Sequence, residues 1–307
     1  MRSLLADLGG GTSPCAPVDP DAVGELLVWF RAECEALVSG CEPAVLPLRL
    51  PKGRISDLLA CERGTVAALG EAGLTEPLVR GRLTDVLVAQ HVTFGIGTDV
   101  ELEVHDALAA AASDVIDWLE QVSEPVRAGV WAHARATAAG LVRDWGPIER
   151  SWWPRLQERL TVPVADGALV LSAQFDLVLG GAPTDRPWVV LEAKSGSVAD
   201  RHRTDLYWYA LVATLRHGHP PSLCATWFAG DGGLVPVPVS LGALEAAGQR
   251  GLAALARLVE LVEDRPPDAR PHAGCAWCPA LDRCEPGLAR TGADQGVTEL
   301  IDAGTRW

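Results

Sequence analysis

Two apolar runs on either side of a turn-rich linker constrain the fold of this chain more than any other feature. Residues 168–179 and 188–194 are rich in branched aliphatic side chains, and the linker between them is rich in glycine and proline. This pattern predicts two strands that pair as a hairpin. Positions symmetric about the centre of the linker then face each other, so we expect Asp176 to lie opposite Leu191 or Glu192.

The second predicted strand ends in a carboxylate and an ammonium group. Glu192 and Lys194 share one face of the strand because they are two residues apart, whereas Ala193 points the other way and can pack into the core. Only Lys52 and Lys194 among the 26 basic side chains are lysine. An ammonium is a compact charge whose proton affinity can be tuned, unlike the permanently charged guanidinium of arginine.

Two carboxylates about 5 Å apart on neighbouring strands repel each other unless a cation lies between them. Magnesium suits this position, because it binds one or two carboxylates together with water and substrate phosphate. It also polarises a phosphodiester and acidifies a bound water. Lys194 would orient or deprotonate that water. A Glu-x-Lys triplet alone is usually a surface ion pair, so the facing Asp176 makes the pattern specific.

Four of the eight cysteines have the spacing of metal ligands. Cys275, Cys278 and Cys284 form a C-x2-C-x5-C pattern in a loop rich in proline and glycine. Cys61, at the end of a short helix-like run, is the best candidate for a fourth thiolate. Zinc or an iron–sulfur cluster could occupy four thiolates, and the spacing alone decides only weakly between them.

Helical periodicity extends over much of the remaining chain. Apolar residues recur at helical intervals over about 19–39, 78–94 and 241–262, and a tryptophan-rich helical pattern covers about 99–160. A further strand is predicted over 222–228. In the helix predicted after the Glu192 strand, Asp205 and Tyr209 lie four residues apart and therefore on one face.

These residues together resemble the PD-(D/E)XK nuclease superfamily over about residues 50–290. The resemblance is closest to the RecB-like branch with a four-cysteine iron–sulfur cluster, which includes CRISPR-associated exonucleases and the nuclease domains of helicase–nuclease enzymes. It implies an α/β fold with a restriction-endonuclease-like mixed sheet flanked by helices. The expected organisation is an N-terminal helical region (1–50), a nuclease domain (51–290) with a helical insertion (99–160), and a C-terminal tail (291–307).

The resemblance also implies a metal-dependent deoxyribonuclease, and an exonuclease in particular, that acts in DNA repair, recombination or CRISPR-type DNA processing. It assigns Mg²⁺ or Mn²⁺ to Asp176 and Glu192 and assistance in hydrolysis to Lys194. The four cysteines that it assigns to a [4Fe–4S] cluster, for which zinc is the alternative, are Cys61, Cys275, Cys278 and Cys284.

Two motifs of that family are altered in this chain. The Gln-x3-Tyr motif reads Asp205-x3-Tyr209, so only the tyrosine carries over. The early Gly-x3-His metal ligand reads Gly81-x3-Asp85, whereas His91 keeps the residue type at another spacing. Asp85 or His91 is therefore the candidate for a further metal ligand. The candidate substrate contacts are Tyr209, Asp205, Arg201 and Arg203.

The net charge of −14 argues against a protein that coats nucleic acid non-specifically. It leaves room for a local cationic groove, or for a helicase or integrase partner that supplies the basic surface for DNA. The alternatives are a catalytically inactive DNA-binding or assembly module of the same fold and a zinc-stapled phosphodiesterase. No run approaches the roughly 18 apolar residues of a membrane helix, so we expect a cytoplasmic protein without a membrane partner.

Overall fold

The computed structural model describes residues 17–69, 73–181, 186–230 and 233–292. Its helices are α2 (Pro20–Val38), α3 (Lys52–Ala60), α4 (Glu62–Ala67), α5 (Glu76–Thr93), α6 (Val100–Ala111), α7 (Ser113–Gln121), α8 (Glu124–Asp144), α9 (Asp200–His217) and α10 (Leu241–Val262). Its strands are β1 (Leu48–Pro51), β2 (Arg155–Val164), β3 (Leu169–Gly181), β4 (Arg186–Lys194), β5 (Leu223–Phe228) and β6 (Leu234–Val237). The short 3-10 helices in these residues are η1 (Pro43–Val45), η2 (Arg150–Trp152), η3 (Ala165–Gly167), η4 (Ala273–Trp277) and η5 (Leu281–Arg283).

Over the described residues the strands form one six-stranded mixed sheet flanked by helices, which confirms the predicted fold class. The strand order is β1-β3-β4-β5-β6, and β2 pairs with β3 beside this path. Strand β4 is antiparallel to β3 but parallel to β5. A parallel pair needs a crossover, and α9 supplies it between β4 and β5.

The predicted hairpin is confirmed as the pair of β3 and β4. Leu177 pairs with Leu191 and Leu179 with Val189. The ladder ends at Leu177, and one further step in the same register would set Asp176 against Glu192, as the symmetry of the linker predicts. The helices predicted over 19–39, 78–94 and 241–262 are present as α2, α5 and α10 within a few residues. The helical pattern expected to reach residue 160 was wrong at its end, because α8 stops at Asp144 and β2 starts at Arg155.

The chain divides into two compact units. The first comprises Met1–Phe30, Leu74–Val162 and Leu171–Gly248, and the second Arg31–Gly73, Pro163–Val170 and Gln249–Trp307. The first unit therefore contains Asp176, Glu192 and Lys194, and the second contains the four cysteines of the predicted metal centre.

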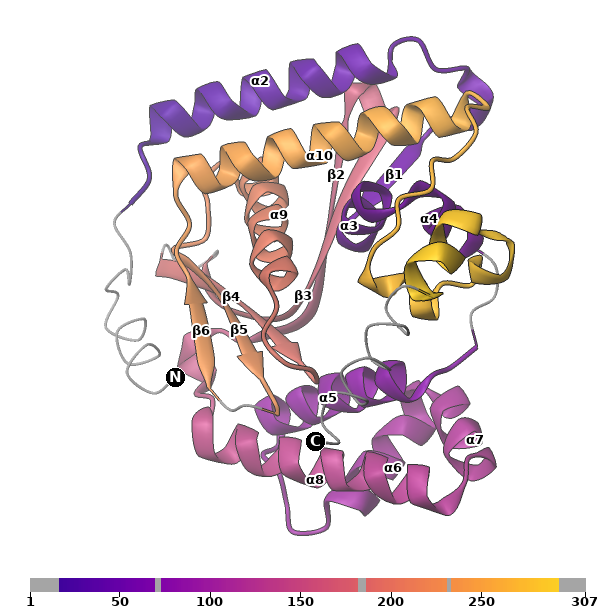
Figure 1. Cartoon of the computed structure of the whole chain (residues 1–307). Coiled ribbons are helices and arrows are strands. Elements are labelled where there is room, and N and C mark those ends of the chain that lie inside the picture. The colour runs from indigo at the N-terminus through magenta and orange to yellow at the C-terminus, as the bar shows by residue number, and fades with distance from the viewer. Residues whose placement is uncertain (1–16, 70–72, 182–185, 231–232, 293–307) are drawn as a thin grey trace, which may run out of the picture. The chain divides into compact units, whose positions relative to one another are not determined.

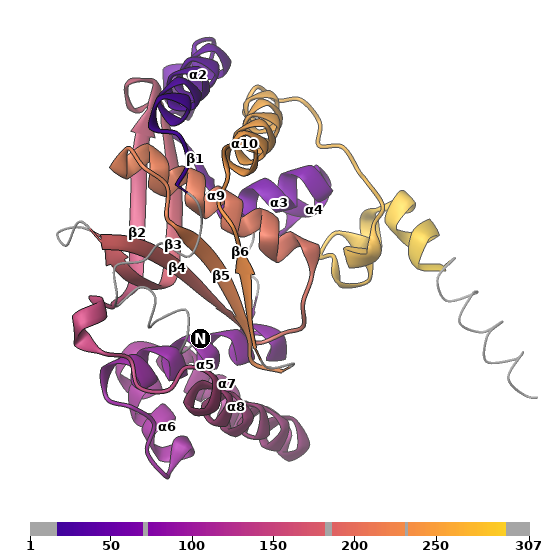
Figure 2. The ribbon, with the colours of Figure 1, turned by 90° about the vertical axis from the view of Figure 1, so that its left-hand side faces the viewer.

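The core of the first unit lies between the sheet and helices α5 to α8. Leu177 and Leu179 of β3, Leu191 of β4 and Trp227 of β5 are buried against side chains of these helices. Because side chains alternate along a strand, Glu192 and Lys194 point to the opposite face, which α9 covers (Figures 1 and 2). None of the helices described is long and apolar enough to cross a membrane.

Candidate active site

The end of the β3–β4 ladder brings two carboxylates together. Beyond the pair Leu177 and Leu191, Asp176 contacts β4 through its side chain, whose Oδ2 accepts a hydrogen bond from the backbone N–H of Ala193 at 2.8 Å. Asp176 is 9% exposed and Glu192 is 4% exposed. The hairpin thus holds two buried acidic groups on adjacent strands at one point of the sheet.

Lys194 lies beside these carboxylates, on the face that the strand periodicity predicts. Its Nζ donates a hydrogen bond to Oε1 of Glu192. The Lys194 side chain is 24% exposed, against 6% for Glu192, so the ammonium group stands nearer to solvent than the carboxylate it contacts. Ala193 between them is part of the hydrophobic core, as expected.

The electrostatics of the site disfavour charge on Asp176. Burial raises the pKa of Asp176 to about 8, and the carboxylates of Glu192 and Asp85 contribute to the rise. The Ala193 hydrogen bond and the charge of Lys194 oppose it without cancelling it. A divalent cation among these carboxylates would reverse the balance, because an opposite charge close to an acid favours its ionised form.

The two candidates for the early metal ligand occupy different surroundings. The charge of Asp85, on α5, raises the pKa of both Asp176 and Tyr209, so its carboxylate belongs to the same acidic cluster. His91 is buried, its Nε2 lies 2.8 Å from the carbonyl oxygen of Gly146, and its ring contacts Trp145 edge-on. Burial also lowers the pKa of His91. Asp85 is therefore close enough to Asp176 and Tyr209 to raise the pKa of each, whereas His91 contacts the carbonyl oxygen of Gly146.

Helix α9 places Tyr209 over the carboxylates. Its ring meets Phe175 edge-on, with centroids 5.1 Å apart. Burial raises the pKa of Tyr209 far above its usual range, and the charges of Glu192, Asp176, Asp205 and Asp85 add to the effect. The phenol is therefore neutral at physiological pH. Arg201 and Arg203 lie in the first turn of α9, where Arg203 is 3.7 Å from Asp200 and both side chains are exposed.

Gln157 is a site residue for which the sequence carries no motif. Its Nε2 lies 3.5 Å from Oδ1 of Asp176, and its Oε1 accepts a hydrogen bond from Gln174 at 2.7 Å. Gln174 in turn accepts one from Arg159 at 2.9 Å. Gln157 has a φ of +48°, a left-handed conformation that is uncommon for residues other than glycine and that gathers at functional sites.

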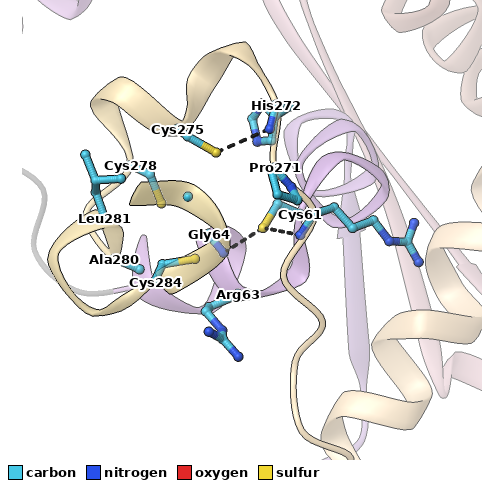
Figure 3. Close-up of a pocket in the computed structure, with 12 residues that line it drawn as sticks. Cys61, Arg63, Gly64, Pro271, His272, Cys275, Cys278, Ala280, Leu281 and Cys284 are labelled. Atoms are coloured by element: carbon cyan, nitrogen blue, oxygen red, sulfur yellow. Dashed lines mark hydrogen bonds between the residues drawn. The ribbon is translucent and has the colours of Figure 1, made fainter. Parts of the chain in front are cut away.

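The four predicted cysteines meet in the second unit. Cys61 ends α3 and begins α4, and Cys275, Cys278 and Cys284 lie in the loop of η4 and η5. Figure 3 shows their sulfur atoms pointing toward one shared space. Backbone N–H groups of Gly64 and Arg270 donate to Cys61 Sγ at 3.5 and 3.4 Å, and that of His272 donates to Cys275 Sγ at 3.3 Å.

An ion-pair network explains how Cys61 reaches a loop more than two hundred residues away. Glu62 is 1% exposed, and its Oε2 accepts hydrogen bonds from Arg265 at 2.8 Å and from the backbone N–H of Asp268 at 2.9 Å. Burial raises the pKa of Glu62, but the Asp268 amide and Arg265 outweigh it, so the pKa is lowered. Arg63 N–H also donates to the carbonyl oxygen of Asp268 at 3.0 Å.

The space that the four thiols enclose is narrow, about 10 Å³, and a second pocket of about 200 Å³ adjoins it along Cys61 and Cys278. Among the described residues, no group of three or more His, Cys, Asp or Glu side chains is arranged to hold a single metal ion. The donor set nevertheless suits soft metal centres, because it consists of thiols that receive backbone hydrogen bonds.

One comparison with known proteins identifies the family of this chain. The profile of the PD-(D/E)XK nuclease superfamily matches residues 58–285. No curated protein matches the chain. The solved structure titled "Crystal structure of SSO0001" aligns over 86% of this chain and 96% of that one, at 11% identity and a TM-score of 0.32, which is too low to establish a shared fold. The superfamily match covers most of the chain, including both strands of the carboxylate hairpin and all four cysteines of the pocket. The chain therefore belongs to the PD-(D/E)XK nuclease superfamily.

Proposed function

We propose that this protein is a Mg²⁺- or Mn²⁺-dependent deoxyribonuclease. The observation that carries the proposal is the end of the β3–β4 hairpin, where Asp176 and Glu192 meet and Lys194 is hydrogen-bonded to Glu192. In a member of a nuclease superfamily, two carboxylates and an ammonium at one point are the groups that metal-assisted hydrolysis of a phosphodiester needs.

Asp176 and Glu192 would hold the metal ion, and Asp85 is the candidate for a third ligand once its side chain turns toward them, because no three acidic side chains of the described residues are already arranged around one ion. Their oxygen atoms are the ligand type that Mg²⁺ prefers, and the burial and neighbouring carboxylates that raise the pKa of Asp176 would favour a cation beside it. When bound, the ion polarises the scissile phosphate and makes a coordinated water more acidic. Asp85 takes the position for which His91 was the alternative, because His91 contacts Gly146 instead.

Lys194 and Tyr209 supply the remaining polar groups. The Lys194 ammonium is partly exposed, so it can hydrogen-bond both to Glu192 and to the phosphate or attacking water and stabilise charge that develops on the phosphate. Tyr209 keeps its proton and can donate a hydrogen bond to a substrate oxygen. Gln157 positions Asp176 from the other side.

We further propose that the protein belongs to the RecB-like branch and that Cys61, Cys275, Cys278 and Cys284 hold a [4Fe–4S] cluster. Three of the four cysteines are buried, and N–H groups donate to two of the sulfurs, a feature that tunes such clusters. Zinc is the competing occupant. Anaerobic purification followed by iron, sulfide and zinc analysis and a visible spectrum separates the two.

Exonuclease action in DNA repair, recombination or CRISPR-type processing is the role that this branch suggests. A helicase or integrase partner would supply the basic surface that a chain with a net charge of −14 does not offer as a whole. A pull-down from extracts of the native organism, with the Lys194→Ala variant as bait, tests for such a partner. Digestion of DNA labelled at one end separates stepwise shortening from internal cuts.

The decisive experiment uses the two lysines of the chain. Wild type, Lys194→Ala and the matched control Lys52→Ala are incubated with labelled single- and double-stranded DNA in Mg²⁺, Mn²⁺ or EDTA. We expect metal-dependent cleavage by wild type and Lys52→Ala, and a loss of at least a hundredfold in Lys194→Ala with an unchanged circular dichroism spectrum. Undiminished cleavage by Lys194→Ala would overturn the assignment. A wild type that binds DNA without cleaving it would identify an inactive module.

A further inference from the structure

A pocket of about 300 Å³ lies in the first unit beside the candidate active site. It is formed by the first two turns of α9, the end of β5, and β6 with the residue after it. Its volume is at the lower end of the range for small-ligand sites. The roles given above to the carboxylates, Lys194 and Tyr209 make no use of this pocket.

The strand register places the pocket on the same face as the candidate catalytic groups. In the parallel β4–β5 pair, Glu192 pairs with Thr226 and Lys194 pairs with Phe228. Laterally paired residues point to the same face of a sheet, and neighbouring strands are about 4.8 Å apart. Thr226 and Phe228 both line the pocket. The pocket is therefore one strand away from Glu192 and Lys194, within reach of the nucleotide next to a phosphate bound there.

His202 is a buried polar side chain in the lining of the pocket. The side chain is 8% exposed and lines the pocket, and its Nδ1 is buried without a hydrogen-bond partner among the described residues. The ring packs on Phe228 with centroids 5.5 Å apart. Burial lowers the pKa of His202, with Lys194 and Arg201 adding to the effect and Asp205 and a backbone hydrogen bond with Ser197 opposing it. Buried polar atoms are nearly always hydrogen-bonded, so a rotation of the ring that turns this nitrogen into the pocket would let it bind a polar atom of a ligand.

Apart from Thr226, Arg203 and Asp200, the rest of the lining is apolar or aromatic. Val198 is 59% exposed and Val235 is 41% exposed at the rim, and Tyr207 is half-buried. Arg203 and Asp200 are the charged groups of the lining, and they face each other at 3.7 Å. An apolar wall, an aromatic ring and few polar groups suit a flat heteroaromatic ligand, since bases stack on aromatic side chains irrespective of sequence.

We propose that this pocket binds the base of the nucleotide adjacent to the scissile phosphate. The base stacks on Tyr207, and one of its ring or exocyclic polar atoms hydrogen-bonds to His202. This inference rests on the proposed nuclease function and specifies its substrate. A base can enter such a pocket only when it is unpaired, so single strands and frayed ends are the substrates and the interior of a duplex is not.

Abasic substrates test the pocket without changing the protein. Labelled single strands of thymidylate carry one tetrahydrofuran abasic unit at successive positions. Stacking of one base contributes about 1–3 kcal/mol, so we expect cleavage at the phosphate next to the abasic unit to fall about tenfold or more and cleavage elsewhere to stay unchanged. Equal cleavage of intact and abasic strands at every position would overturn the proposal that the pocket binds a base, while the proposed nuclease function would still hold.

Variants of Tyr207 provide the second readout. Tyr207→Ala should raise KM for intact strands about tenfold with kcat nearly unchanged, and it should lose the sensitivity to the abasic unit. Tyr207→Phe keeps the ring and should behave as wild type. Thymidine 5′-monophosphate binding in Ca²⁺, measured by calorimetry, should weaken about tenfold in Tyr207→Ala. If wild type cleaves no DNA, the proposed function fails, and the binding measurement then tests the pocket by itself. No binding by wild type, or equal binding by wild type and Tyr207→Ala, would overturn the proposed base-binding pocket.

Discussion

Replacement of Asp176 by asparagine tests the electrostatics of the candidate active site directly. Burial and the carboxylates of Glu192 and Asp85 raise the pKa of Asp176 to about 8, whereas an aspartate in an unfolded chain titrates near pH 4. Between these values the folded protein holds a proton that the unfolded chain has released. The stability that protonated Asp176 contributes is therefore fully present below about pH 4 and is lost as the pH rises through 8.

The pKa difference sets the magnitude of this effect. A difference of one bound proton between the folded and unfolded states changes the free energy of unfolding by about 1.4 kcal/mol per pH unit. Between about pH 5.5 and 7.5, the wild type should lose roughly 2–3 kcal/mol relative to Asp176→Asn, which has no group to titrate there. The asparagine Oδ1 can still accept the hydrogen bond from Ala193, so the variant keeps the local structure.

Urea unfolding of both proteins in EDTA, at several pH values across this range, measures the difference. If the free energies of unfolding of wild type and Asp176→Asn depend on pH in the same way, the pKa of Asp176 is not raised by burial and the neighbouring carboxylates. Added Mg²⁺ should stabilise the wild type more at about pH 7.5 than at 5.5, because the ion binds the deprotonated carboxylate. The asparagine variant should respond less to the metal and less to pH.

The remaining predictions concern the cysteine pocket and Gln157. Cys278→Ala should lower the iron content and melting temperature of anaerobically purified protein together; iron loss with unchanged melting would exclude a stabilising cluster. Glu62→Gln should lower the free energy of unfolding by about 1–3 kcal/mol, because Arg265 loses its buried carboxylate. The control is Glu35→Gln, at an exposed position. Equal stability of the two variants would contradict a stabilising role of the Glu62 ion pairs. Gln157→Gly should be about 1 kcal/mol more stable than Gln157→Ala, since φ at this position is positive. If urea unfolding shows the reverse order of stability, the backbone at Gln157 is not strained.

The carboxylate hairpin could be predicted because its geometry is local. Once the turn is recognised, the position of Asp176 against Glu192 follows from counting residues on either side of the linker, and the pairing of Leu177 with Leu191 confirms the count. The shared face of Glu192 and Lys194 follows from strand periodicity alone. The strand assignment depended on apolar runs long enough to exclude other structures.

Contacts between distant segments could not be predicted in the same way. Gln157 on β2 contacts Asp176 on β3. No sequence pattern predicts a residue with left-handed backbone conformation within a strand. The choice between Asp85 and His91 depended on the side of α5 that faces β4, which the sequence around Gly81 does not determine. The helical pattern was extended past Asp144 because tryptophans continue at Trp145, Trp152 and Trp153, in residues that form a loop and η2 ahead of β2.

The contact of Glu62 with Arg265 and Asp268 joins the two parts of the cysteine pocket through protein groups alone. Cys61 precedes Glu62 in the chain, and Arg270, which donates to Cys61 Sγ, follows Asp268 closely. We therefore expect the cysteine pocket to be folded in the metal-free protein. A cluster could then be assembled from iron and sulfide after the chain has folded. It could be lost on exposure to oxygen and assembled again in the same molecule.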